Sequence, residues 1–339
     1  MRSAALGMAL AGLAAALPAQ ERPQPTPTPG PGSAGVVTSL TVFAGTTEGL
    51  YRSRDWGSTW QAAVGSNGKT YGLDGVGAVR DVVPLGPLVF LGGNGGVYLS
   101  DDFGETWHRA ETGAPVVRVM PSRYPFSDLT VFAATTSGLL KSTDGGRTFG
   151  PTPLARMSVS RIEWPGPALV VATSRGVFVS SDAGATFTAS EAGLPEGDVR
   201  ALAVSSFFAA DPVMFAGVGA AGVYRSSDGG RTWTQAGLQG QNVTDLAWLG
   251  PFLYAVSESG LYRSEDLGRN WELLTKKLAA PPTRVLFPLM PDSGSEIFLG
   301  TVGGMYRSPD GGLNWTPSGL DGLTVLCLGT FPAPEARKR

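Results

Sequence analysis

Short apolar runs alternate with glycine-rich turns along most of the chain. A run such as "TVFAGTT" is followed, after a tight loop, by a second run such as "LYRS", which is typical of a β-hairpin. Seven such hairpins precede a polar turn, and all but the first have another apolar run upstream, such as "VRDVV" or "VRALAV". With the segment after the turn, each unit contains four predicted strands, which we call A to D. The content of 48 Gly and 26 Pro in 339 residues agrees with an all-β protein of many short strands.

The polar turn between strands C and D recurs seven times as S-x-D-x-G-x-(T/N)-(W/F). The copies run from "SRDWGSTW" near residue 53 to "SPDGGLNW" near residue 308. Their aspartates are Asp55, Asp102, Asp144, Asp182, Asp228, Asp266 and Asp310. The spacing of 38 to 47 residues, with four strands per unit, predicts propeller blades rather than a helical solenoid.

Each position of this turn has a structural explanation. The Asp carboxylate accepts hydrogen bonds from backbone N–H groups that follow it, and the Gly permits a positive φ. The Ser and Thr hydroxyls bind neighbouring backbone, and the final aromatic residue returns to the interior between sheets. Paired acids catalyse reactions elsewhere, but seven equivalent acids, one in each unit, indicate seven structural turns.

The first unit has no upstream apolar run of its own apart from "VVTSL". The missing inner strand is found at the other end of the chain, at Gly322–Gly329 ("GLTVLCLG"). We therefore predict a single seven-bladed β-propeller over residues 36–330. Its ring is closed by the C-terminal strand, which pairs into blade 1 and removes an exposed sheet edge.

The two ends of the chain read differently from the body. Residues 1–19 place Arg2 before an apolar run and small residues, which predicts a secretory signal peptide cleaved after Ala16 or Ala19. Residues 20–35 form a Pro-rich linker, and residues 331–339 a short basic tail. The apolar run within residues 1–19 is too short to span a membrane. The mature protein is thus expected in the periplasm or outside the cell, as a monomer.

Composition excludes several classes of site. A single Cys327 and a single His108 allow neither a disulfide framework nor a His/Cys metal cluster, so no metal and no cofactor are expected. Cys327, within "LTVLCLG", is interpreted as a buried apolar residue. The net charge of −2 gives no electrostatic case for nucleic-acid binding.

The seven turns are Asp boxes, and the chain resembles the Asp-box (BNR) repeat β-propellers over nearly its whole mature length. Sialidases, xyloglucanases, sortilin-like receptors and the photosystem II stability/assembly factor family carry such boxes. One propeller of seven blades behind a signal peptide is most similar to the last group. That resemblance implies a non-catalytic scaffold or assembly factor that binds a protein partner.

The enzymatic relatives match less well. The family pattern of sialidases begins with a Phe/Tyr-Arg-Ile-Pro stretch, and "SRIEWP" at residues 160–165 has only the Arg-Ile pair. Xyloglucanases of this type use two propellers, and this chain is long enough for one. The loop acids Glu48, Asp74 and Glu258 are interpreted as solvated surface. A glycan-active enzyme or glycan binder that uses the channel mouth remains the alternative function.

Aligned inner strands show a second repeat. The segments "VRDV", "VRVM", "SRIE", "VRAL", "VTDL", "TRVL" and "LTVL" align Arg80, Arg118, Arg161, Arg200, Thr244, Arg284 and Thr324. In the family topology this position lies at one mouth of the channel, opposite the Asp boxes. Like charges there need compensation. In one arrangement, neighbouring acids on the same strands compensate the arginines: Asp81, Glu163, Asp198 and Asp245. In a second, the guanidinium groups bind an anion or an acidic protein partner, because guanidinium suits carboxylate and phosphate. In a third, the arginines point outward to the surface.

Two further features concern the surface. The arginine-lined mouth would be framed by loops holding Glu48, Asn94, Arg175 and Glu258, and by the insertion Gly65–Ala78. On the opposite face, the variable box residue is apolar at Trp56 and Phe103. These two side chains form either an exposed contact patch or, as we favour, a surface covered by the N-terminal linker.

Overall fold

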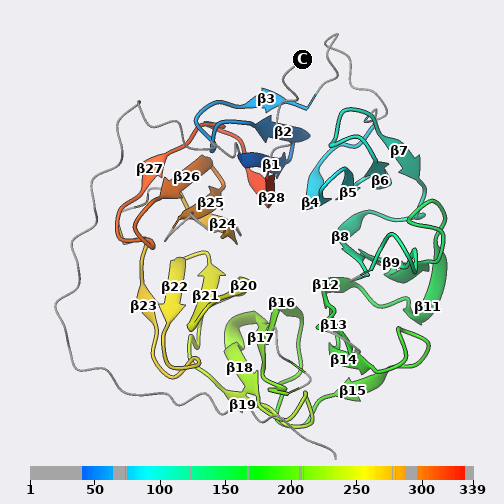
Figure 1. Ribbon diagram of the computed structural model, residues 1–339. Helices are drawn as coiled ribbons and strands as arrows, with labels where there is room; N and C mark the ends of the chain where they lie inside the picture. Colours follow the sequence, from blue (N-terminus) through cyan, green and yellow to red (C-terminus); the bar gives the residue numbers. More distant parts are fainter. Residues whose placement is uncertain are drawn as a thin grey trace, which may run out of the picture. The chain divides into compact units, whose positions relative to one another are not determined.

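A computed structural model of the chain describes residues 40–63, 73, 75–122, 124–165, 168–205, 208, 210–276, 278, 280–287 and 296–332. The predicted signal peptide and linker lie outside the described residues, and so does the predicted tail from residue 333 on; the first two residues of that tail, Phe331 and Pro332, belong to the last strand. Within them, seven four-stranded antiparallel sheets are arranged around a common axis (Figure 1). The predicted seven-bladed β-propeller is confirmed. We number the sheets as blades 1 to 7 and keep the letters A to D for the strands of each blade.

Blades 1 to 4 are listed from the inner strand A to the outer strand D. Blade 1 contains β28 (Val325–Pro332), β1 (Leu40–Thr46), β2 (Leu50–Ser53) and β3 (Gln61–Ala62). Blade 2 contains β4 (Val79–Leu85), β5 (Leu88–Gly93), β6 (Gly96–Ser100) and β7 (His108–Ala110). Blade 3 contains β8 (Val116–Pro121), β9 (Val131–Thr135), β10 (Gly138–Ser142) and β11 (Gly150–Ala155). Blade 4 contains β12 (Val159–Glu163), β13 (Leu169–Thr173), β14 (Gly176–Ser180) and β15 (Thr188–Ser190).

Blades 5 to 7 follow the same order. Blade 5 contains β16 (Val199–Val204), β17 (Met214–Val218), β18 (Gly222–Ser226) and β19 (Thr234–Gln235), with the short 3-10 helix η1 (Gly219–Ala221) in its B–C turn. Blade 6 contains β20 (Val243–Leu249), β21 (Phe252–Ser257), β22 (Gly260–Ser264) and β23 (Glu272–Leu273). Blade 7 contains β24 (Pro282–Leu286), β25 (Ile297–Thr301), β26 (Gly304–Ser308) and β27 (Thr316–Pro317).

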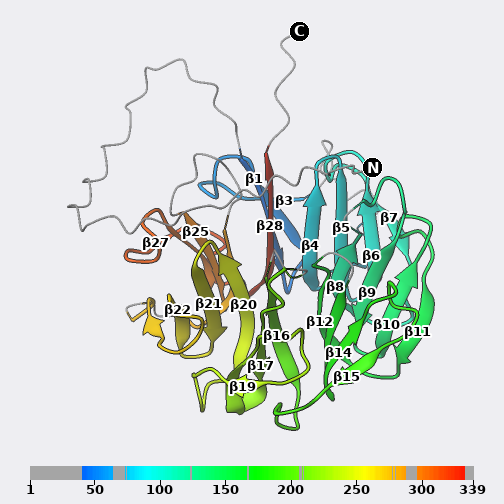
Figure 2. The same cartoon turned by 60° about the horizontal axis from the view of Figure 1, so that its bottom comes forward.

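The C-terminal strand closes the ring as predicted, three residues further along the chain than Gly322–Gly329. β28 pairs antiparallel with β1 from Leu40↔Pro332 to Thr46↔Val325, and Figure 2 shows the two strands side by side. The other edge of β28 accepts a hydrogen bond from blade 7. Thr283 Oγ1 of blade 7 donates to the Val325 carbonyl at 2.5 Å. The last strand of the chain therefore joins blade 7 to blade 1.

The Asp boxes close the C–D turns through hydrogen bonds made inside each turn. In the fifth box, Thr232 N and Oγ1 donate to the two carboxylate oxygens of Asp228 at 2.9 and 2.6 Å, and Gly230 N donates to Ser226 Oγ at 2.8 Å. The hydrogen bond from the Thr232 hydroxyl lowers the pKa of Asp228 to about 2. The Ser, Asp and Thr of the motif are thus all hydrogen-bonded within the turn, although the Thr hydroxyl binds the Asp carboxylate and not the backbone as predicted.

The glycine of the box also lets neighbouring blades approach. A Cβ atom built on Gly184 would lie 2.9 Å from the Phe132 ring of the preceding blade, and one on Gly146 would lie 3.1 Å from Phe90. Both glycines have a positive φ. These phenylalanines are fully buried, so the space between blades is filled by strand B of one blade and the box of the next.

Candidate functional site

All seven inner strands have a β-bulge at their first residues, and this bulge positions the side chains of the channel. In each inner strand one residue is left out of the pairing with strand B. The unpaired residues are Arg80, Val117, Ser160, Arg200, Thr244, Thr283 and Leu326. The residues that follow them are Asp81, Arg118, Arg161, Ala201, Asp245, Arg284 and Cys327. We call these two sets the bulge layer and the inner layer.

The five predicted arginines therefore do not share one position. Arg80 and Arg200 belong to the bulge layer, whereas Arg118, Arg161 and Arg284 belong to the inner layer. Thr324, which the alignment placed with them, precedes β28. The alignment matched arginines by identity. It placed Arg118, Arg161 and Arg284 one residue after the bulge position and Thr324 two residues before it, because the unpaired bulge residue leaves no mark in the apolar alternation.

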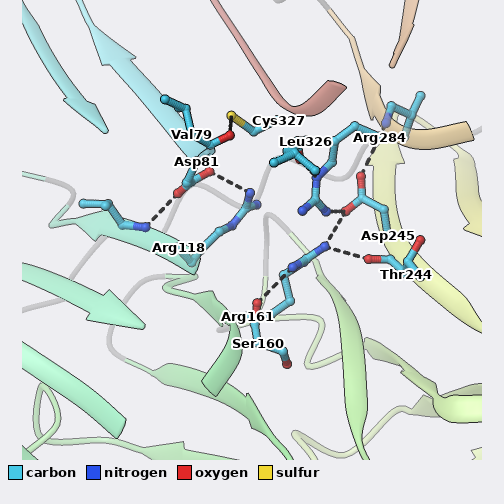
Figure 3. A network of polar contacts seen from close by, with 12 residues as sticks. Val79, Asp81, Arg118, Ser160, Arg161, Thr244, Asp245, Arg284, Leu326 and Cys327 are labelled. Atoms are coloured by element: carbon cyan, nitrogen blue, oxygen red, sulfur yellow. Dashed lines mark hydrogen bonds and ion pairs between the residues drawn. The ribbon is translucent and has the colours of Figure 1, made fainter. Parts of the chain in front are cut away.

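In the inner layer, aspartates satisfy the free edge of the next blade. Asp81 of blade 2 pairs with Arg118 of blade 3 at 3.0 Å and accepts the Val119 backbone N–H at 2.7 Å. Asp245 of blade 6 repeats this arrangement with Arg284 of blade 7, at 3.0 Å (Figure 3). Each carboxylate compensates a cation and a strand-edge N–H group that would otherwise be buried without a partner.

Arg161 points from blade 4 toward Thr244 and Asp245 of blade 6, as Figure 3 shows. Its guanidinium donates to the Thr244 carbonyl at 2.6 Å and lies 3.5 Å from Asp245, two blades away. The residue between them in the inner layer is Ala201, whose small side chain leaves the path open. Arg161 is only 6% exposed, and its Nε has no hydrogen-bond partner among the described residues.

Burial and charge shift the pKa values of this layer in opposite directions. Burial and the nearby Arg284 lower the pKa of Arg161 to about 9, so it stays protonated at neutral pH. Burial would raise the pKa of Asp245, but Arg284 and Arg161 hold it below its usual value. Burial raises the pKa of Glu163, on the same strand as Arg161, to about 7 although Arg118 opposes the shift. The three arginines are thus only partly neutralised by the two aspartates.

The bulge layer opens into a cavity of about 500 Å³ at the mouth of the channel. Its lining includes four of the five predicted arginines: Arg80, Arg161, Arg200 and Arg284. Asp198 also lines it and pairs with the half-exposed Arg200 at 2.9 Å. Arg80 Nε donates to Asn94 Oδ1 at 3.4 Å. Arg118 is not part of this lining; it pairs with Asp81 in the inner layer, beside Arg161 and Arg284 (Figure 3).

Of the loop residues expected around the mouth, Glu48 and Arg175 line other cavities. Asn94 is near the arginines, but Glu48 lines a separate cavity of about 300 Å³ between blades 1 and 2. Arg175 lines another, of about 570 Å³. In the insertion, Leu73 and Val76 are buried in the core between blades 1 and 2, and Asp74 lies outside the described residues. The insertion therefore contributes packing where it is described.

Trp56 and Phe103 are both partly buried against described neighbours. Phe103 lies 5.8 Å from the ring of Phe331, at the end of β28. Trp56 is partly buried, and the Arg307 guanidinium lies 5.9 Å from its ring centre. The predicted exposed patch was wrong, because described neighbouring side chains partly cover both residues. The linker of the favoured arrangement lies outside the described residues, so that arrangement stays a prediction. Cys327 is buried as predicted, and burial raises the pKa of its thiol.

The described residues include neither a metal-binding cluster nor a membrane-spanning helix. No group of three or more His, Cys, Asp or Glu side chains among them could hold a metal ion. In the same part of the chain, no helix is long and apolar enough to span a lipid bilayer.

These features define an Asp-box β-propeller, and the comparisons with known proteins agree. The family model of the BNR/Asp-box repeat matches residues 98–109, which include the second box. A comparison with curated proteins gives no match. The solved structures that resemble the chain share its fold.

Three of them represent different classes. YCF48 bound to D1 peptide is 18% identical, with a TM-score of 0.55, over 70% of this chain and 80% of that one. An ancestral GH74 enzyme is 24% identical, with a TM-score of 0.56, over 68% of this chain. This chain covers 36% of the length of that enzyme. An extracellular domain from B. thetaiotaomicron is 16% identical, with a TM-score of 0.61, over 81% of this chain and 39% of that one.

Proposed function

We propose that this protein is an exported, non-catalytic scaffold that binds an acidic segment of a protein partner at the mouth of its channel. The observation that carries the proposal is the 500 Å³ cavity, where four guanidinium groups face one carboxylate. Guanidinium groups suit carboxylates because they present several donors in one plane. The YCF48 structure, which contains a peptide, supports a protein segment as the ligand.

The lining of the cavity favours binding over glycoside hydrolysis. Hydrolysis of this kind uses two carboxyl groups that flank the scissile bond. Among the described lining residues the one carboxylate is Asp198, and Arg200 occupies it at 2.9 Å. We therefore place the glycan-active alternative second.

Export rests on the pattern of residues 1–19, and similarity to extracellular domains supports it. N-terminal sequencing of the mature protein should give a start near Leu17 or Gln20. Cytoplasmic protein that retains Met1 or Arg2 would contradict export.

Binding can be tested with a fluorescein-labelled peptide of eight glutamates, by anisotropy at low salt. We expect the R80A/R200A variant to bind it at least about tenfold more weakly, because both side chains line the cavity outside the buried inner layer. The control is R231A/R269A, which removes the same charge from two exposed box residues. Equal losses in the two variants would mean nonspecific attraction, and no loss in R80A/R200A would overturn the proposed site.

A further inference from the structure

A second cavity adjoins the mouth over the seam between blades 4 and 5. It measures about 570 Å³ and is lined on one side by the B–C turn of blade 4, Ser174–Gly176. The other side is the connection between β15 and β16, which contributes Glu191, Leu194, Pro195, Glu196 and Gly197. We call it the outer cavity. It differs in chemistry from the mouth, because its walls combine an apolar Leu-Pro pair with two glutamates.

The two cavities share continuous walls. On one side the Gly197–Asp198 peptide bond joins them, since Gly197 lines the outer cavity and Asp198 lines the mouth. On the other side the Ser174 N–H of the outer cavity donates to the carbonyl of Ser158, which lines the mouth, at 3.0 Å. A ligand can therefore pass from one cavity to the other without leaving the protein surface.

The walls of the outer cavity are held in place from behind. Trp233 N donates to the Ala192 carbonyl at 2.8 Å, and Leu194 packs partly buried against the core between blades 4 and 5. Gly219 N donates to the Asp198 carbonyl at 3.1 Å. Because the backbone is fixed at these three points, the cavity exists before a ligand arrives, which lowers the entropy cost of binding.

The charged side chains that line the outer cavity are exposed to solvent. Glu191 and Glu196 are exposed, and neither forms an ion pair in the described part of the chain. Arg175 stands on the opposite wall and is exposed as well. The mouth has an excess of positive charge and the outer cavity an excess of one negative charge, so the continuous surface is polarised from the channel outward.

We propose that the partner segment runs from the mouth into the outer cavity and carries charges of both signs. Its acidic group occupies the arginine-lined mouth, an apolar side chain covers Leu194 and Pro195, and a lysine or arginine lies against Glu191 and Glu196. Two adjoining cavities of this size have centres on the order of 10 Å apart, which about three residues of extended chain span. The proposal rests on the proposed function and adds the sequence polarity of the partner.

Three labelled peptides separate the two proposals: acidic-only EEEGGG, bipolar EEEGLGKK, and EEEGLGQQ, which lacks the basic end. We expect all three peptides to bind the wild-type protein and to bind the R80A/R200A variant more weakly. We also expect the bipolar peptide to bind the wild-type protein about tenfold more tightly than EEEGLGQQ does. In E191Q/E196Q that preference should disappear while EEEGGG binds as before. The matched control is E48Q/E258Q, which removes two exposed loop acids elsewhere and should keep the preference.

The outcomes are distinguishable. If EEEGGG fails to bind the wild-type protein, the proposed function fails with it. If EEEGGG binds through Arg80 and Arg200 but the lysines add nothing, or E191Q/E196Q keeps the preference, the outer cavity is no part of the site. Thermal melts of each variant should match the wild type, because these side chains are exposed.

Discussion

The Asp boxes and the starts of the inner strands both repeat seven times, but they differ in where their polar groups find partners. Each box keeps nearly the same side chains and satisfies them within its own turn, as Asp228 shows. The inner strands keep the same bulged backbone but change its side chains, and their charges are satisfied between blades. In the boxes, side chains that are repeated in every blade have a local structural role. In the inner strands, a repeated backbone with varied side chains can form an asymmetric site.

The largest expected effect comes from removing the shared closing strand. A chain that ends at Ser318 lacks β28, so β1 has a free edge and the bulge layer loses Leu326. We expect this chain to aggregate or to unfold without a cooperative transition. A calorimetric melt that matches the full-length protein would contradict the role of β28 in closing the ring.

The next effect separates buried from exposed ion pairs. Asp245→Ala leaves Arg161 and Arg284 without their shared carboxylate and should lower the free energy of unfolding by about 3–5 kcal/mol. Its control, Asp198→Ala, breaks a half-exposed pair and should lower it by less than about 1 kcal/mol. Urea unfolding measures both. Equal losses would show that the inner layer is not effectively buried.

A box aspartate should have an intermediate effect. Asp228→Ala leaves turn N–H groups unsatisfied and should lower the free energy of unfolding by on the order of 1–3 kcal/mol, with peptide binding retained. Asp101→Ala, at an exposed box position, is the control.

The same aspartate gives a pH test. The pKa of Asp228 is lowered from 3.8 to about 2 in the folded state. Its contribution is therefore complete above about pH 4 and disappears as the pH falls toward 2. A difference between Asp228→Ala and the wild type that persists at pH 2 would contradict this role.

The smallest effect concerns Glu163. Its pKa is raised from 4.5 to about 7 in the folded state, so the folded protein binds a proton that the unfolded chain releases. Stability should therefore fall as the pH rises from about 4.5 to 7. Glu163→Gln should remove this slope and stabilise the protein by about 1–2 kcal/mol at pH 8, with no change at pH 4. Parallel pH profiles for both proteins would show that Glu163 is ionised throughout.

The sequence predicted more of the fold than of the site. The boxes, the seven blades and the closure by residues near 325 follow from local patterns that each unit repeats. The register of the arginines does not, because "VRVM" and "VVRV" fit the same alternation, and only the pairing with strand B reveals the bulge. Coverage of Phe103 by Phe331 joins residues far apart in sequence. Glu191 and Glu196 stood in an ordinary polar connection, "SEAGLPEGD", with no repeated pattern to single them out.

The closing strand also sets the order of events during synthesis. Blade 1 receives its inner strand from residues 325–332, whereas its other strands begin at Leu40. The ring therefore stays open until residues 325–332 have left the ribosome, and β1 keeps an unpaired edge during that time. The propeller therefore cannot complete its fold while only its first blades have been synthesised, and the chain stays incompletely folded for a longer part of its synthesis.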